Sequence, residues 1–262
     1  MSQRKRGGAV VSQNKSVRKS QQVVLDEDED VDMSFTQPTS SQVQKAREIF
    51  TPVQVDLKVA EVVQFILIKD QKKMPIRRTD IAKHVIKEYR ALYQDIMKKA
   101  DRTFEQVFGL KLVEIDSKNH VYILINKLQP VPGEPVSMCP GSAKTGLLFV
   151  ILSVVFMKGG TVKENVVWNT LKKLRVDVGE KHEDFGDVKK VVTDEFVRQR
   201  YLEYVRIPHT EPLEFEIRWG QRAEKEVSKM KLLEFIGELH NQEPQSWTQQ
   251  YKEATSAESS QR

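Results

Sequence analysis

The stretch GSAKTG, residues 141–146, is a near miss for a phosphate-binding loop. Such a loop needs a Lys and then a Ser or Thr after the spaced glycines, because these side chains hold the β- and γ-phosphates and the magnesium ion. Here Leu147 and Leu148 follow the last glycine instead. The stretch also ends a segment rich in proline and glycine, which is typical of a linker. We therefore interpret it as part of a linker and not as a nucleotide site.

Metal ligands and catalytic nucleophiles are sparse in this sequence. The five histidines are scattered, at positions 84, 120, 182, 209 and 240. The single cysteine, Cys139, excludes an intramolecular disulfide and cannot form a structural zinc site by itself. It lies among prolines with no local Cys-His signature, so we do not assign it as a nucleophile. We expect a protein that is not an enzyme and that has no cofactor and no catalytic or metal site.

The amino-acid composition is typical of a soluble protein with a hydrophobic core. Hydrophobic residues make up 39% of 262 residues, and a net charge of +5 permits contact with nucleic acid without requiring it. The start of the chain has no apolar h-region, so we expect no signal peptide. The most apolar run, residues 146–157, is too short for a membrane-spanning helix, which needs about 20 residues. We expect this run to be a buried core helix.

The chain divides by composition into two folded blocks and three other segments. The N-terminal segment is rich in Ser, Gln and Lys and contains the acidic run DEDED, so it cannot bury enough surface to offset its ordering entropy. Four prolines and three glycines mark a second break at 129–146. We predict a disordered tail at 1–51, a first unit at 52–128, a linker at 129–145, a second unit at 146–250 and a disordered tail at 251–262.

The first block has the pattern of three helices followed by a β-hairpin. Apolar residues recur at helical spacing from Val55 to Ile68, and the helix that they predict is apolar over most of its circumference. A second helix follows Pro75, with Thr79 or Asp80 as its cap, and Gly109 ends a third. KLVEID and HVYILIN then flank the turn SKN. This order is the winged-helix arrangement.

The second block repeats that order. A buried helix at 147–157 ends at two glycines, Thr161 is a candidate cap for the next helix, and DVKKVVTDEFVRQRYL supplies a third. EYVRIP and EFEIRWG predict the wing strands, and residues 223–240 predict one closing helix whose apolar residues lie mainly toward one side: Val227, Met230, Leu233, Phe235 and Ile236. The predicted fold class is mainly α with small β wings, in tandem winged-helix domains.

Clustered basic residues are the more informative functional candidates. The run Lys69–Arg102 holds eleven Lys or Arg and five Asp or Glu, and the second block has islands around its third helix. Each cluster is either a solvated helix surface or a set of phosphate contacts made by a helix-turn-helix module. No pattern for reading bases is evident, so any DNA binding should be directed at the backbone and sensitive to salt.

Four of these residues lie on the third helix predicted in the second unit, the element that faces the duplex in such modules. Lys189 and Arg200 are eleven residues apart, close to three full turns, so we expect them on one side of that helix. Arg198 is the weakest candidate because an ion pair could hold it. The candidate DNA-binding residues are Lys189, Lys190, Arg198 and Arg200.

Several long segments resemble the MAGE homology domain. They are VFGLKLVEID, TGLLFVILSVVFMKGG, DFGDVKKVVTDEFVRQRYLEYVRIPHTEP and WGQRAEKEVSKMKLLEFIGELHNQEPQSW. The resemblance covers about Val55 to Tyr251 and implies tandem winged helices. VRQRYLEYVRIPHTEP in particular is similar to the branch of the family found in the repair-type structural-maintenance-of-chromosomes (SMC) complex.

The resemblance also implies function and partners. Members of the family bind RING-type ubiquitin ligases and enhance them. The SMC-complex branch assembles with a RING subunit, non-SMC element one, and a kleisin, non-SMC element four, and contributes to DNA binding, mainly through the second unit. The family's dileucine for RING binding corresponds here to Ile66 and Leu67. We expect a nuclear, chromosome-associated scaffold subunit with double-stranded DNA and the SMC core as further partners and no membrane contact. The alternative is a regulatory adaptor of a RING ligase outside any chromosome complex.

Overall fold

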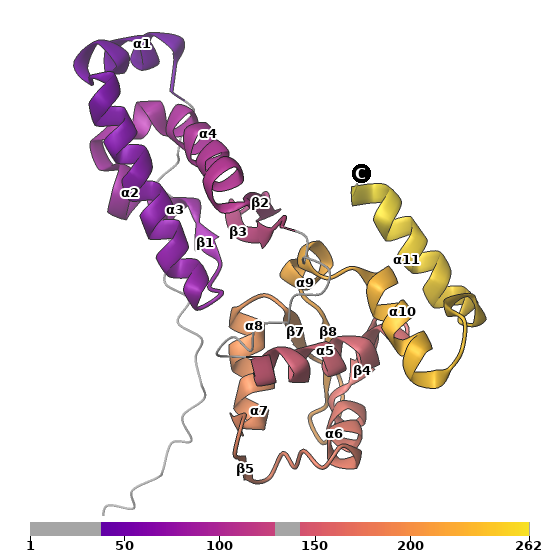
Figure 1. The fold of residues 1–262 in the computed structure, drawn as a ribbon. Coiled ribbons are helices and arrows are strands. Elements are labelled where there is room, and N and C mark those ends of the chain that lie inside the picture. The colour runs from indigo at the N-terminus through magenta and orange to yellow at the C-terminus, as the bar shows by residue number, and fades with distance from the viewer. Residues whose placement is uncertain (1–37, 129–141, 262) are drawn as a thin grey trace, which may run out of the picture. The chain divides into compact units, whose positions relative to one another are not determined.

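The computed structural model describes residues 38–128 and 142–261, and Figure 1 shows their fold. Within these ranges the chain is mostly helical and forms three small antiparallel sheets. The described residues from Thr39 onward form one compact unit. The disorder predicted for 1–37 and the linker predicted at 129–141 lie outside the described residues.

A helix that the sequence did not predict, α1 (Ser40–Ile49), precedes the first winged helix. It begins at a capping box, in which the Thr39 hydroxyl accepts from the Gln42 backbone N–H and the Gln42 side chain accepts from that of Thr39. Ala46 is buried, and Arg47 pairs with Asp95 at 2.7 Å. The prediction of a disordered tail as far as residue 51 was therefore wrong for residues 40–49. Local caps and a single small buried residue are enough to fix this polar helix.

The first winged helix begins with the long apolar helix that the sequence predicts, which is α2 (Pro52–Gln71). Its start has a second capping box, Thr51 with Gln54, and Pro52 at its first position, where no N–H is needed. One side of α2 enters the core through Val62 and Ile66. The remaining elements are β1 (Ile76–Arg77), α3 (Arg78–Ile81), η1 (Ala82–Ile86), η2 (Lys87–Leu92), α4 (Tyr93–Thr103), η3 (Phe104–Phe108), β2 (Leu110–Asp116) and β3 (Val121–Asn126).

Gly109 ends the third helix as predicted. Its φ of +62° is left-handed, a conformation that glycine adopts without strain. The helix cap predicted at Thr79 or Asp80 is wrong, since α3 begins at Arg78 directly after strand β1.

The second winged helix opens with α5 (Ser142–Met157), so residues 142–145 of the predicted linker are helical. The predicted break at Gly159 and Gly160 is confirmed, and both have a φ of +89°. Thr161 is not a cap, because it starts strand β4 (Thr161–Lys163). The next elements are α6 (Glu164–Lys173), β5 (Lys181–His182), β6 (Gly186–Asp187), α7 (Val188–Lys190), η4 (Val191–Glu195), α8 (Phe196–Arg198), β7 (Leu202–Arg206) and β8 (Phe215–Trp219).

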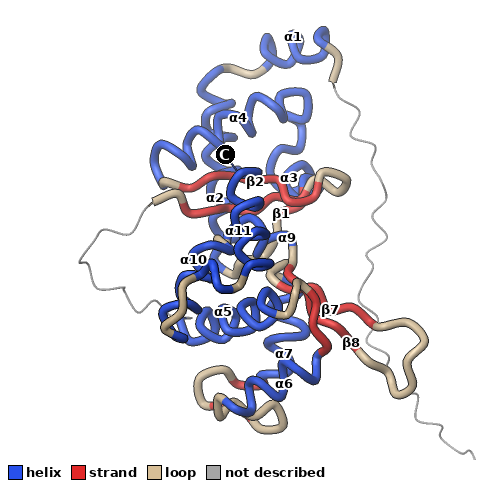
Figure 2. Tube along the Cα trace, turned by 90° about the vertical axis from the view of Figure 1, so that its right-hand side faces the viewer, coloured by secondary structure: helices blue, strands red, loops and turns tan. Residues whose placement is uncertain are grey.

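The two winged helices have the same sheet topology. In each, a short strand before the second helix pairs with the second strand of the hairpin, which gives the orders β1-β3-β2 and β4-β8-β7. Figure 2 shows both hairpins as red strand pairs. The predicted fold class, tandem winged helices with small β wings, is confirmed.

The C-terminal part differs from the sequence prediction in two ways. The single closing helix is broken at Val227, and Ser228 caps a new helix by accepting from the Lys231 N–H. The tail predicted as disordered from 251 is helical to 261, because Trp247, Tyr251 and Ala254 form a spaced stripe that packs on the core. These elements are α9 (Gln221–Glu226), α10 (Lys229–His240), η5 (Pro244–Ser246) and α11 (Thr248–Gln261).

Candidate interaction surfaces

A groove of about 670 Å³ lies between α2 and the α4–η3 segment of the first winged helix. Its walls are mainly apolar, and Lys99 and Asp56 pair across its edge at 2.7 Å. Large apolar side chains that line it are open to solvent: Ile68 is 56% exposed and Val107 is 69% exposed. An exposed apolar groove with a polar rim is the usual form of a site for a helix or an apolar peptide segment. The lining side chains are those of Asp56, Val59, Ala60, Val63, Gln64, Leu67, Ile68, Gln71, Lys99, Arg102, Thr103, Val107 and Phe108.

The structure does not bring Ile66 and Leu67 together on this surface. Ile66 is 0% exposed and belongs to the core, whereas Leu67 is half-buried and lines the groove. Successive helical residues are about 100° apart around the axis, which on α2 turns Ile66 into the core and leaves Leu67 and Ile68 on the side of the groove. Ile68 and Phe108 also line the groove and were not among the site residues predicted from the sequence. The unusually apolar sequence of α2 indicates that the helix has an apolar surface beyond its core side. The spacing of its apolar residues does not show which side the rest of the domain leaves uncovered.

A second exposed apolar surface lies on the second winged helix and its closing helix. Phe235 and Leu239, one turn apart on α10, are 44% and 66% exposed. The Phe235 ring meets Phe149 of α5 edge-on, at 5.2 Å between centroids. The prediction that Phe235 shares one side of the helix with Leu233 and Ile236 was wrong, because those two residues are buried and Phe235 is exposed. We name Phe149, Phe235 and Leu239 the α10 surface.

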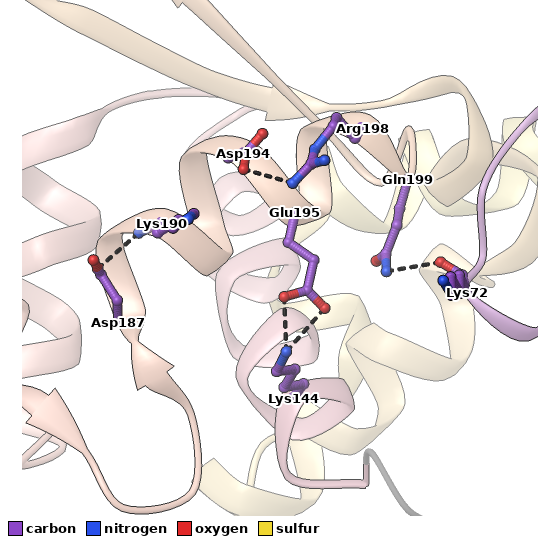
Figure 3. A network of polar contacts seen from close by, with 8 residues as sticks. All are labelled: Lys72, Lys144, Asp187, Lys190, Asp194, Glu195, Arg198 and Gln199. Carbon is purple, nitrogen blue, oxygen red and sulfur yellow. Dashed lines mark hydrogen bonds and ion pairs between the residues drawn. The ribbon is translucent and has the colours of Figure 1, made fainter.

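Figure 3 shows part of the segment that carries the predicted DNA-binding residues; this segment runs from the start of α7 to Arg200, residues 188–200, and we name it the basic segment. Asp187 caps its start by accepting from the backbone N–H of Lys190 at 3.0 Å. The side chains of Lys189 and Lys190 are exposed, and neither is in an ion pair within the part of the chain that the structure describes. These two lysines are therefore available to phosphate groups.

Both acidic residues of this segment are neutralised internally. Asp194 accepts from Arg198 at 2.6 Å, and the two carboxylate oxygens of Glu195 accept from Lys144 at 3.0 and 2.7 Å (Figure 3). The pair formed by Arg198 is exposed, with 56% of the arginine side chain open to solvent. Arg198 therefore has less free charge to offer than the lysines.

Arg200 does not lie on the same helix face as Lys189. The five residues of η4 form a π-turn, which adds a residue to the helical repeat, and α8 ends at Arg198. Arg200 follows with a left-handed φ of +65°. The predicted alignment of Lys189 and Arg200 over three regular turns was wrong, because sequence spacing assumes an unbroken α-helix.

Gln199 and Arg200 turn toward the first winged helix. The Gln199 side-chain amide donates to the Lys72 carbonyl at 3.2 Å (Figure 3). The pKa of Asp116 is lowered, mainly by hydrogen bonds from Asn119 and to a smaller extent by the positive charge of Arg200.

The rival basic run, Lys69–Arg102, is partly neutralised. Lys73 pairs with Asp70 at 2.9 Å and Lys99 with Asp56 at 2.7 Å, while Lys83 and Arg90 are exposed. The charge excess counted in sequence therefore overstates the free charge of this surface.

The described ranges contain neither a metal-binding cluster nor a membrane-spanning helix. No group of three or more His, Cys, Asp or Glu residues there could hold a metal ion. No described helix combines the length and apolarity that crossing a membrane requires.

Comparison with known proteins gives consistent matches. The family model of the MAGE homology domain matches residues 62–230. The mouse protein "Non-structural maintenance of chromosomes element 3 homolog" is 52% identical over 211 residues, which cover 80% of this chain and 76% of that protein. The human protein of the same name is 52% identical over 207 residues, covering 78% and 68%. A chain of a solved Nse1-Nse3-Nse4 complex matches with a TM-score of 0.76 and 56% identity, covering 79% of this chain and 100% of that chain.

Proposed function

The chain belongs to the MAGE homology domain family, and on that premise we propose that it is a non-catalytic scaffold subunit of the SMC-type DNA-repair complex. In this role it corresponds to the Nse3 subunit and holds a RING ubiquitin-ligase subunit, Nse1, and a kleisin subunit, Nse4. It acts in the nucleus, on the chromosome. Its similarity to the Nse3 homologues and to a chain of the Nse1-Nse3-Nse4 complex supports this assignment.

One observation carries the proposal beyond similarity: each winged helix leaves its own apolar surface open although its core is complete. The groove exposes Ile68 and Val107, and the α10 surface exposes Phe235 and Leu239. Exposed side chains of this size on folded units are typical of protein-binding sites. Two separate surfaces fit a subunit that holds two protein partners at once.

We assign the RING subunit to the groove. Leu67, the member of the predicted pair that lines the groove, lies next to Ile68, and Phe108 closes the groove from the other side. Ile66 supports this surface from within the core. The kleisin then takes the α10 surface, where two apolar side chains one turn apart suit an amphipathic helix.

We also propose that the scaffold contributes DNA binding and enhances the ligase. Lys189 and Lys190 supply contacts to phosphate that do not depend on base sequence, and the exposed Arg200 adds charge at the other end of the segment. Arg198 takes a lesser part because Asp194 holds it. A RING subunit held in the groove of a DNA-bound scaffold promotes the transfer of ubiquitin from a charged conjugating enzyme near the complex, so a protein without catalytic groups can enhance a ligase.

The test is purification of the tagged full-length chain from cells, with one surface changed at a time. Phe108→Asp should lose the RING subunit and keep the kleisin, and Leu239→Asp should do the reverse, since both side chains are exposed in the folded chain. Circular dichroism checks that each variant is folded. Retention of both partners by both folded variants would overturn the assignment of the surfaces.

The same purification separates the proposal from its alternative. Recovery of SMC subunits with the wild-type chain supports the scaffold. Recovery of a RING ligase without SMC subunits would favour a regulatory adaptor that works outside a chromosome complex.

A further inference from the structure

Arg222 of α9 is the one charged residue that is buried among the described residues, and its exposure is 0%. Its guanidinium lies over the ring of Tyr201, 5.3 Å from the centroid. Two carboxylates flank it at the same distance: Nη1 is 3.6 Å from Asp70 Oδ1 and 3.6 Å from Glu226 Oε2. Glu226 belongs to α9 itself, whereas Asp70 comes from α2 of the first winged helix.

This charge cluster is incompletely satisfied. Within the described chain, none of the three guanidinium nitrogens has a hydrogen-bond acceptor, and Asp70 Oδ1 has no donor. A buried charge without hydrogen bonds is costly, and such a group in a folded protein calls for an explanation. At 3.6 Å the contact between Asp70 and Arg222 is longer than a hydrogen bond, so it can still shorten, and shortening it would satisfy both groups.

Asp70 lies on the turn of α2 that also forms the end of the groove. Leu67, Ile68 and Gln71 of the same turn line the groove, while Asp70 lies against Arg222. Lys73 holds the other carboxylate oxygen of Asp70 at 2.9 Å. Anything that packs into this end of the groove therefore contacts the turn that carries Asp70.

Arg222 is fixed in turn to the end of the basic segment. Its backbone N–H donates to the Arg200 carbonyl at 2.9 Å, and the Gly220 N–H donates to the Tyr201 carbonyl at 2.7 Å. The approach is so close that a Cβ on Gly220 would lie 2.3 Å from the Arg200 carbonyl oxygen. The start of α9 and the end of the basic segment therefore move together.

A second contact joins the same elements. The Gln199 side chain donates to the carbonyl of Lys72, the residue that caps the end of α2 (Figure 3). α9 also packs on β2 and β3 of the first winged helix. The end of α2 thus contacts the end of the basic segment directly through Gln199, and indirectly through Asp70 and Arg222 of α9.

We propose that the contact between Asp70 and Arg222 couples the groove to the basic segment, so that docking of the RING subunit and binding of duplex DNA strengthen each other. This inference rests on the proposed function of both surfaces. A partner in the groove orders the last turn of α2, which favours the closed contact and the placement of Gln199 and Arg200. Duplex binding then costs less conformational entropy, because the basic segment is already ordered. Thermodynamic linkage requires DNA to raise the affinity for the RING subunit by the same factor.

The test measures the affinity of the full-length chain for a fluorescent 30-base-pair duplex, with and without saturating RING subunit. Asp70→Asn removes the charge from α2 at nearly constant shape. Glu226→Gln is the matched control, because it makes the same change at the same distance from Arg222 but within α9.

We expect the RING subunit to tighten duplex binding by the wild-type chain about fivefold, a typical size for coupling between sites. The fivefold effect of the RING subunit on duplex affinity should persist in Glu226→Gln and fall to about one in Asp70→Asn. Both variants should still bind the RING subunit alone and the duplex alone with the affinity of the wild type. A factor of one in the wild type, or an unchanged factor in Asp70→Asn, would overturn the coupling while leaving the scaffold intact. Failure of the wild type to bind the RING subunit or the duplex at all would overturn the proposed function and this inference with it.

Discussion

Ile66 and Leu67 are neighbours in sequence but face different environments across α2. Ile66 is 0% exposed in the core of the first winged helix, and Leu67 lines the apolar groove. The two positions therefore separate stability from binding, although a dileucine-like pair suggests one shared role.

The first prediction compares alanine at these two positions. Ile66→Ala should lower the free energy of unfolding by about 2–5 kcal/mol, because it leaves a cavity in a closed core. Leu67→Ala should cost much less stability and should weaken RING-subunit binding, since that side chain faces the groove. Urea titration and a binding titration on the same samples measure both effects. A reversed pattern, with Leu67 setting stability and Ile66 setting affinity, would contradict the assignment of the groove.

The second prediction concerns DNA. Charge reversal of Lys189 and Lys190 together should weaken binding to all duplex sequences alike, because contacts to phosphate carry no sequence information. Two lost contacts should reduce the slope of log affinity against log salt by about 1.8. Affinities measured at several salt concentrations give this slope.

A matched double variant in the rival basic run is the control for this measurement. Lys83→Glu with Arg90→Glu makes the same charge change on exposed residues of the first winged helix. It should leave the slope nearly unchanged. If this variant flattens the slope and the lysine variant does not, the run Lys69–Arg102 is the DNA surface.

Much of the fold could be predicted because its signals are local. Helical and alternating periods, together with the stops at Gly109 and at the 159–160 glycines, gave the order of helices and hairpins in both units. Strands β1 and β4 were missed because two or three residues carry no readable period. The break at Val227 was missed because the residues on both sides fit one helical pattern.

The functional surfaces were less predictable, since they depend on which side of an element is left uncovered. Composition marks arginine as a surface residue, so nothing in the sequence predicts that Arg222 is fully buried. The π-turn η4 likewise has no sequence signature that we recognised, and it changes where Arg200 lies relative to Lys189. Both errors come from tertiary packing that overrides local pattern.

The third prediction is a pH dependence of stability at the β2–β3 turn. Asp116 accepts hydrogen bonds from the backbone N–H groups of Lys118 and Asn119 and from the Asn119 side chain, which lower its pKa. A carboxyl whose pKa is lower in the folded state contributes stability above its unfolded pKa and loses that contribution as pH falls through the folded value. Asp116→Asn should therefore lower the melting temperature at neutral pH. The difference from wild type should shrink toward zero under acid conditions, and a constant difference at all pH values would contradict this account.

The last prediction compares two glycines that the sequence does not distinguish. Gly220 lies where a Cβ would be 2.3 Å from the Arg200 carbonyl oxygen, and that atom belongs to backbone that cannot move aside without breaking the junction with α9. Gly146 lies near the start of α5 with nothing within 4 Å of its added Cβ. Gly220→Ala should therefore lower the free energy of unfolding by more than about 1 kcal/mol, whereas Gly146→Ala should raise it by about 0.5–1 kcal/mol, the usual gain for alanine over glycine in a helix. Chemical denaturation of both variants beside the wild type measures the two changes. Equal effects at the two sites would mean that the backbone at Arg200 moves easily to make room for the added Cβ. The connection between α9 and the basic segment would then not be rigid, and it could not explain the coupling.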